Sequence, residues 1–159
     1  MKALETISWD EKTRSVLLID QTKLPQSYRI IRCRTVDRLI TAIMRLEVRG
    51  APALGLAGAY GVALAAVTIR ERDFHRYFHQ VESAALEIGK ARPTAVNLSW
   101  GVLQVLAKIR LAGSIEEVRI VALKEAQKLA DEDAAACHAL GDYGAALLPE
   151  TCTVLTHCN

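Results

Sequence analysis

The residues with the clearest chemical potential stand at a predicted helix start and are Arg49, Gly50, Ala51 and Pro52. Proline is tolerated in the first turn of a helix because the first amide groups have no partner inside the helix. These N–H groups and the positive end of the helix dipole attract anions. Gly50 and Ala51 would let a ligand approach the backbone, and Arg49 could donate a forked pair of hydrogen bonds. The pattern predicts a phosphate or carboxylate pocket, and an ordinary capped core helix with a surface arginine is the alternative.

A second arginine–proline pair repeats this arrangement. Arg92 and Pro93 precede Thr94 and a segment with helical spacing over residues 95–103. Two such helix starts in one short chain suggest two contacts with a single anionic small molecule. Only folding could bring the two together.

Composition narrows the possible partners. The chain has 159 residues, of which 51% are apolar and 24% charged, and its net charge is +2. This size and balance suit a globular unit with a sizeable core. The small net charge creates no field that would draw in nucleic acid or an anionic membrane, so neither is expected as a partner. The arginines between Arg29 and Arg49 are interpreted as a solvated face whose functional member is Arg49, because few aromatic residues accompany them.

An uncharged run over residues 51–69 is borderline in length for a membrane span. It is rich in Ala and Gly rather than in Leu, Ile and Phe, so it predicts a buried helix. Small residues repeat every fourth position in it and form a smooth stripe for close packing, at Ala53, Ala57, Gly61 and Ala65. Residues 1–6 have neither an apolar signal core nor a transit-peptide composition, so a cytoplasmic location is expected.

The cysteines and histidines give no metal-site pattern. No two cysteines form a CxxC pair, which favours free thiols at Cys33, Cys137, Cys152 and Cys158. His75 and His79 are four residues apart, but the glutamate of a zinc-protease helix is missing between them and no third ligand is evident. We therefore expect neither a metal nor another cofactor.

Short β-branched segments predict strands at residues 7–10, 15–20 and 28–33. Helical spacing then predicts five helices, at about residues 35–47, 52–69, 73–90, 94–111 and 114–143. The last helix begins at a capping box, with Ser114 and Glu117 as the paired residues. Gly141, Gly144 and Pro149 are expected to end it.

Residues 151–159 have the pattern of a buried strand, which needs a neighbouring strand on each side. No later strand follows in this chain. The segment is therefore interpreted as the first strand of a parallel α/β domain whose remainder is absent.

Four blocks of residues give the chain a family resemblance. They are Asp20-Gln21-x-x-Leu24-Pro25, Val48–Ala53 with Gly55 and Ala59-Tyr60-Gly61, Arg92–Leu98, and Leu155–Asn159. In order and spacing the chain resembles the N-terminal half of the methylthioribose-1-phosphate isomerase family. Its superfamily includes ribose-1,5-bisphosphate isomerases and regulatory subunits of translation initiation factor 2B. The fold class implied is α/β, with a β-strand and helical domain at residues 1–145 and an incomplete Rossmann-like domain from residue 150 to 159.

The resemblance also implies an activity. The family converts an aldose 1-phosphate to a ketose 1-phosphate in methionine salvage, as cytoplasmic homodimers without a cofactor. It assigns substrate binding to Arg49, Gly50, Ala51 and Arg92, and catalysis to Cys158. A non-catalytic regulatory or assembly module, or a ribose-1,5-bisphosphate isomerase-like protein, is the alternative.

Family members are about twice as long, and their second half carries the acid–base partner. We therefore expect this chain to be inactive alone and to need a C-terminal half of the same protein. A second chain, cleavage after Asn159 or a truncated gene product would each account for its length, and cleavage is the explanation hypothesised.

Overall fold

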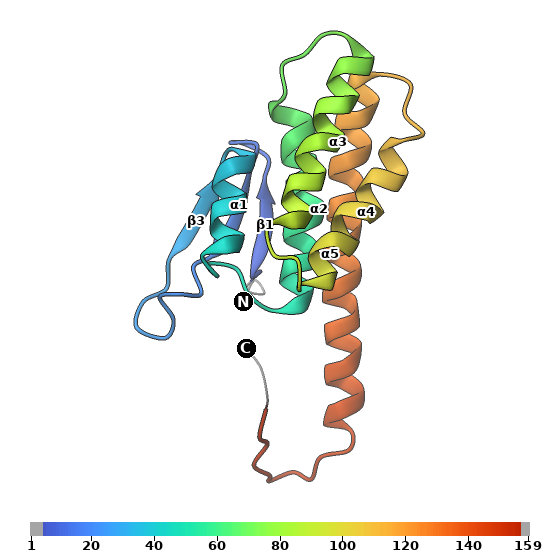
Figure 1. The fold of residues 1–159 in the computed structure, drawn as a ribbon. Coiled ribbons are helices and arrows are strands. Elements are labelled where there is room, and N and C mark those ends of the chain that lie inside the picture. The colour runs from blue at the N-terminus through green and yellow to red at the C-terminus, as the bar shows by residue number, and fades with distance from the viewer. Residues whose placement is uncertain (1–4, 157–159) are drawn as a thin grey trace.

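The computed structural model describes residues 5–156 as a small sheet followed by helices (Figure 1). The strands are β1 (Ile7–Asp10), β2 (Ser15–Ile19) and β3 (Ile30–Cys33). The helices are α1 (Val36–Met44), α2 (Ala51–Thr68), α3 (Phe74–Lys90), α4 (Val96–Ile109) and α5 (Ile115–Ala145). These elements agree with the predicted order of strands and helices and form an α/β fold.

The sheet is antiparallel in the order β1-β2-β3. The central strand β2 is buried along most of its length, and Leu17 is its one less buried residue. The register pairs Val16 with Cys33 and Leu18 with Ile31. β1 and β2 pack on α2, whereas β3 contacts α1, so the sheet covers one side of the central helix.

The central element is α2, which contacts all four other helices. By length and composition it could cross a membrane, with a mean hydropathy of 1.5, but 83% of it is buried inside the fold. The prediction of a buried helix is confirmed. Its Gly61 lies against side chains of Leu39 in α1 and Ile88 in α3, so the predicted stripe of small residues does pack closely.

The closest helix contact is made on another face of α2. A methyl group on Gly101 of α4 would overlap the carbonyl oxygen of Gly55, and one on Gly58 would overlap the carbonyl oxygen of Leu98. Glycine at these positions lets the two backbones touch. The helices cross near Gly55 and Gly101, close to where each begins.

The end of α2 is held by a side chain of α5. The Arg119 guanidinium donates from Nε to the carbonyl oxygen of Ala66 at 3.2 Å and from Nη2 to that of Ile69 at 3.3 Å. It also lies over the ring of Tyr77, whose hydroxyl donates to Ala66 at 2.6 Å. The last carbonyls of a helix lack partners within it and carry partial negative charge, so this arginine stabilises the C-terminal end of α2.

α5 differs from its prediction at both ends. The Ser114 hydroxyl accepts from the Glu117 amide at 3.2 Å, but the Glu117 carboxylate accepts from Gly113 rather than from Ser114. The helix continues through Gly141 and Gly144 to Ala145, so the prediction that these glycines end it is wrong. A glycine inside a helix costs only about 1 kcal/mol relative to alanine and does not stop the hydrogen-bond ladder. Residues 134–145 are exposed and extend away from the other helices (Figure 1).

The predicted strand at residues 151–159 is not formed where the structure describes it. Residues 151–156 are exposed and lie outside any strand, because a strand needs hydrogen bonds to a neighbour and the three strands of the described chain pair only with one another. Residues 157–159 lie outside the described part of the chain. The strand and the Rossmann-like domain it would open stay predictions.

The glycine contact between α2 and α4 predicts opposite effects for two glycine-to-alanine substitutions. Gly101→Ala should lower the free energy of unfolding by about 1–3 kcal/mol, because its methyl group would meet backbone that cannot move aside. Gly89→Ala in α3 makes only an ordinary contact, 3.6 Å from Ser99 Oγ, and should raise that free energy by up to about 1 kcal/mol. Urea denaturation measures both, and equal effects would contradict the proposed close approach.

Arg119 predicts a stability effect through its hydrogen bonds to α2. Arg119→Met should lower the free energy of unfolding by about 1–2 kcal/mol, since two helix carbonyls lose charged donors. Arg72→Met is the matched control, because it removes an exposed arginine outside the helices. If urea denaturation gives the same change for both variants, Arg119 does not stabilise the end of α2.

Candidate functional site

The predicted anion pocket begins at the N-terminus of α2. Gly50 is the N-cap and has a φ of 93°, a left-handed conformation that favours glycine, and Pro52 stands in the first turn. Ala51 and Pro52 are exposed. The small residues, the proline and the helix start therefore occur as predicted, with an accessible first turn.

The Arg49 side chain is partly buried and faces the loop after β2 rather than open solvent. Its Nη2 donates to the backbone carbonyl of Gln21 at 2.9 Å, and its own carbonyl accepts from Gln21 Nε2 at 3.2 Å. Its Nε is buried without a hydrogen-bond partner in residues 5–156. One edge of the guanidinium is thus used by the fold, and Nε–H is left as a charged donor.

The second arginine–proline pair lies in a turn that precedes its helix. Residues 92–95 form a turn in which the Ala95 amide donates to the Arg92 carbonyl at 2.9 Å. Pro93 occupies the second position of this turn, where the backbone φ is close to the value that the proline ring imposes. α4 begins at Val96, so Pro93 precedes the helix, as the sequence predicts.

The fold nevertheless brings the two helix starts together. Pro52 of α2 and Asn97 of α4 line one depression of about 290 Å³, whose other lining residues are Leu56, Trp100, Leu129, Glu132 and Asp133. The two arginine side chains are not among its lining residues. Helix N-termini favour anions, while the α5 carboxylates can accept hydrogen bonds from hydroxyl groups. Together they suit a small molecule that carries both a phosphate and hydroxyls.

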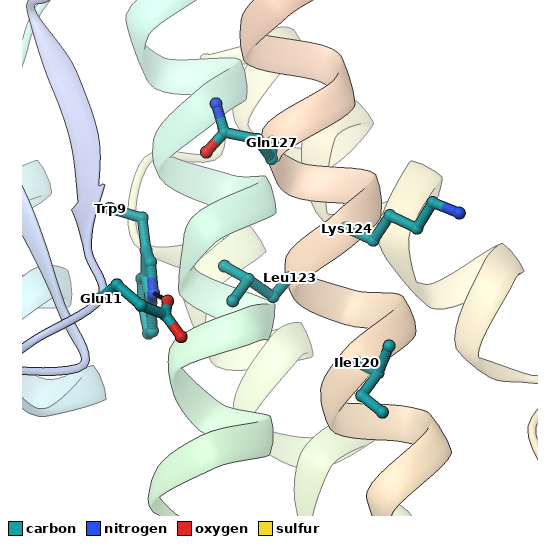
Figure 2. A pocket seen from close by; sticks show the side chains of 6 residues that line it. All are labelled: Trp9, Glu11, Ile120, Leu123, Lys124 and Gln127. Atoms are coloured by element: carbon teal, nitrogen blue, oxygen red, sulfur yellow. Dashed lines mark hydrogen bonds between the residues drawn. The ribbon is translucent and has the colours of Figure 1, made fainter.

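A larger depression lies elsewhere, between β1 and α5 (Figure 2). Its volume is about 420 Å³ and its lining residues are Trp9, Glu11, Ile120, Leu123, Lys124 and Gln127. Tyr60 of α2 contacts two of these lining residues. Its ring stacks on Trp9 with centroids 6.5 Å apart, and its hydroxyl donates to Gln127 Oε1 at 3.2 Å. None of the predicted site residues lines it, so it is not the predicted pocket.

The predicted catalytic residue, Cys158, lies outside the described residues. Cys33 is fully buried, and burial raises the pKa of its thiol to about 11 despite the opposing charge of Arg38. A thiol with so high a pKa is almost wholly protonated at neutral pH, and the thiolate is the reactive form. Cys33 is therefore a core residue rather than a nucleophile.

The remaining sequence predictions concern charge and metals. Arg29, Arg34 and Arg45 are exposed, and Arg38 pairs with Glu47 at 2.7 Å, which agrees with a solvated basic face. Within residues 5–156 no three His, Cys, Asp or Glu side chains come together as a metal site.

Sequence reasoning did not assign a role to several residues of this region. Gln21 and Asn97 each belong to one of the sequence blocks that carry the family resemblance, but the sequence predicted no contact for either side chain. Glu132 and Asp133 gave no local signal, because only the packing of α5 against α2 and α4 brings them to the depression.

Comparisons with known proteins show the family and the fold to which the chain is similar. Residues 47–159 match the sequence profile of the "Initiation factor 2 subunit family". The methylthioribose-1-phosphate isomerase of Picosynechococcus sp. is 41% identical over 161 residues, which cover 99% of this chain and 46% of that protein. The chain thus spans about half the length of the curated relatives it matches.

Two solved structures share the fold. The 5-methylthioribose 1-phosphate isomerase of Pyrococcus horikoshii has a TM-score of 0.88 at 34% identity, covering 94% of this chain and 42% of that one. The translation initiation factor eIF-2B subunit delta of A. fulgidus has a TM-score of 0.87 at 46% identity, covering 92% and 42%. The two names show that both enzymes and translation factors share this architecture. Since the family profile matches most of its residues, the chain belongs to the initiation factor 2 subunit family.

Proposed function

We propose that this chain forms the phosphate-binding part of a sugar-phosphate aldose–ketose isomerase that converts 5-methylthioribose 1-phosphate to 5-methylthioribulose 1-phosphate in methionine salvage. The observation that carries the proposal is the depression shared by the first turns of α2 and α4. Relatives named as methylthioribose-1-phosphate isomerases support the choice of substrate.

The substrate's chemistry explains why a firm phosphate site is needed. A phosphate on the anomeric oxygen prevents the sugar from opening to a free aldehyde. The ring oxygen must instead gain a proton as its bond to C1 breaks. Hydrogen then moves from C2 to C1 while the C2 hydroxyl loses its proton, so the overall change is an isomerisation. Such a sequence requires fixed orientation, an acid–base pair and little water.

In this proposal Arg49, Gly50 and Ala51 bind the phosphate, with Arg92 as a second contact. The Arg49 Nε lacks a hydrogen-bond partner in the described chain, so the guanidinium keeps an unused charged donor. Cys158 acts in catalysis, and the acid–base partner comes from a C-terminal half that this chain does not contain. The complete protein is proposed to act as a cytoplasmic homodimer.

A non-catalytic regulatory or assembly module is the second candidate. The similarity to the initiation factor subunit of A. fulgidus favours it. Such a module would have no need of a reactive thiol next to the phosphate site. Turnover and its dependence on Cys158 therefore distinguish the two candidates.

Substrate binding should depend on Arg49. Arg49→Met should weaken binding of 5-methylthioribose 1-phosphate by about 10-fold or more, because a charged hydrogen bond contributes about 1.5–3 kcal/mol. Arg92→Met should have a smaller effect, and Arg34→Met, at an exposed position, should have none. Isothermal titration calorimetry measures all three against the unchanged chain, with ribose 1,5-bisphosphate as a competing ligand. Unchanged affinity in Arg49→Met would remove Arg49 from the site.

Turnover should require both Cys158 and a second half. The chain alone should not convert 5-methylthioribose 1-phosphate, whereas the chain co-purified with the C-terminal half of the Pyrococcus horikoshii enzyme should do so. In that complex Cys158→Ser should reduce turnover at least 100-fold, an effect comparable to losing a general acid or base, and Cys152→Ser should not. Product formation is followed by phosphorus NMR. Full activity in Cys158→Ser, or turnover by the isolated chain, would contradict the assignment.

A further inference from the structure

Gln21 is a buried polar residue that the proposed function does not use. It follows β2, in the loop between Ile19 and β3, and is 8% exposed. It belongs to the Asp20-Gln21 block that the sequence singled out without a role. A buried amide must have hydrogen-bond partners, and those partners show what the residue does.

Every hydrogen bond recorded for Gln21 joins it to the segment between α1 and α2. Its amide donates to the Glu47 carbonyl at 3.0 Å, its carbonyl accepts from Arg49 Nη2 at 2.9 Å, and its Nε2 donates to the Arg49 carbonyl at 3.2 Å. Gln21 and Arg49 are thus joined reciprocally, with each residue's side chain bonded to the other's backbone.

The position of Gln21 is itself fixed by the sheet. The Asp20 amide donates to the Arg29 carbonyl at 2.9 Å, and the Asp20 carboxylate accepts from the amide and the hydroxyl of Thr22 at 3.0 and 2.6 Å. The loop after β2 is therefore a rigid support. Because Gln21 is held in place, its two hydrogen bonds to Arg49 also fix the position of Arg49.

The segment between α1 and α2, residues 45–50, needs contacts that hold its conformation. Leu46 follows α1 with a φ of 61°, and the Glu47 amide donates to the Ala42 carbonyl at 2.9 Å. Four residues later Gly50 has a φ of 93°. Left-handed conformations persist only where their surroundings hold them, and the contacts of Gln21 lie between these two positions.

We propose that Gln21 is the positioning residue of the anion site, acting through Arg49 and Gly50. Its carbonyl accepts from Arg49 Nη2 and so fixes the guanidinium, whose Nε–H has no partner within residues 5–156. Its side-chain amide fixes the carbonyl of the Arg49–Gly50 peptide. Because a trans peptide points its N–H opposite to its carbonyl, this bond turns the Gly50 N–H away from Gln21. This inference rests on the proposed function.

The test uses the 159-residue chain and Gln21→Met, which removes only the Nε2 hydrogen bond. We expect this variant to shift the NMR signals of the Gly50 amide and the Arg49 Nε–H. It should also weaken binding of 5-methylthioribose 1-phosphate about fivefold, as expected for one hydrogen bond. Gln26→Met, an exposed glutamine of the same loop, is the matched control and should change neither.

A double-substitution cycle with Arg49→Met separates positioning from general damage. The Gln21 side chain bonds to the Arg49 backbone carbonyl, which Arg49→Met keeps, so adding Gln21→Met to Arg49→Met should still weaken binding about fivefold through the Gly50 peptide. Unchanged affinity on that addition would overturn the proposal, as would unshifted Gly50 and Arg49 signals in Gln21→Met. If Gln21→Met fails to fold, Gln21→Glu keeps the shape of the side chain, and the same two signals decide.

Failure of the proposed function gives a different result. If the unchanged chain binds neither 5-methylthioribose 1-phosphate nor inorganic phosphate, the isomerase proposal loses its phosphate site. The Gly50 and Arg49 signals in Gln21→Met still report whether Gln21 positions the loop. The two proposals therefore fail separately.

Discussion

The contact of the α2 and α4 backbones at Gly55 and Gly101 is the constraint on which the rest of the structure depends. Both glycines lie near the start of their helices, so this crossing brings the two N-termini to one depression. A side chain at the crossing would separate the helices and open the site. The cost of glycine in a helix is offset by packing around α2, most of which is buried.

The loop after β2 fixes the segment that precedes α2. Gln21 and Arg49 are 28 residues apart in sequence and bonded reciprocally. Arg49 Nη2 thereby holds the loop, and its Nε–H has no partner within residues 5–156. A guanidinium can hold the loop and keep a further donor because its five N–H groups lie in one rigid plane. Neither helix packing nor the helix dipole alone would orient it.

Most element boundaries could be predicted because their signals are local. The side chains of Thr35, Asp73 and Ser114 cap helices by accepting amide hydrogen bonds three residues ahead, a contact set by sequence spacing alone. The error at the end of α5 occurred where a residue type allows two outcomes, because Gly141 weakens a helix without ending it.

The sequence by itself determined the order of strands and helices, the buried nature of α2 and the start of α2 at Gly50 and Pro52, because propensity, periodicity and capping act over a few residues. Only the tertiary structure decided that the two helix starts share a depression with Glu132 and Asp133. It also decided that Gln21 holds Arg49. These contacts join residues far apart in the chain, and their geometry depends on how closely whole helices pack, which no local pattern encodes.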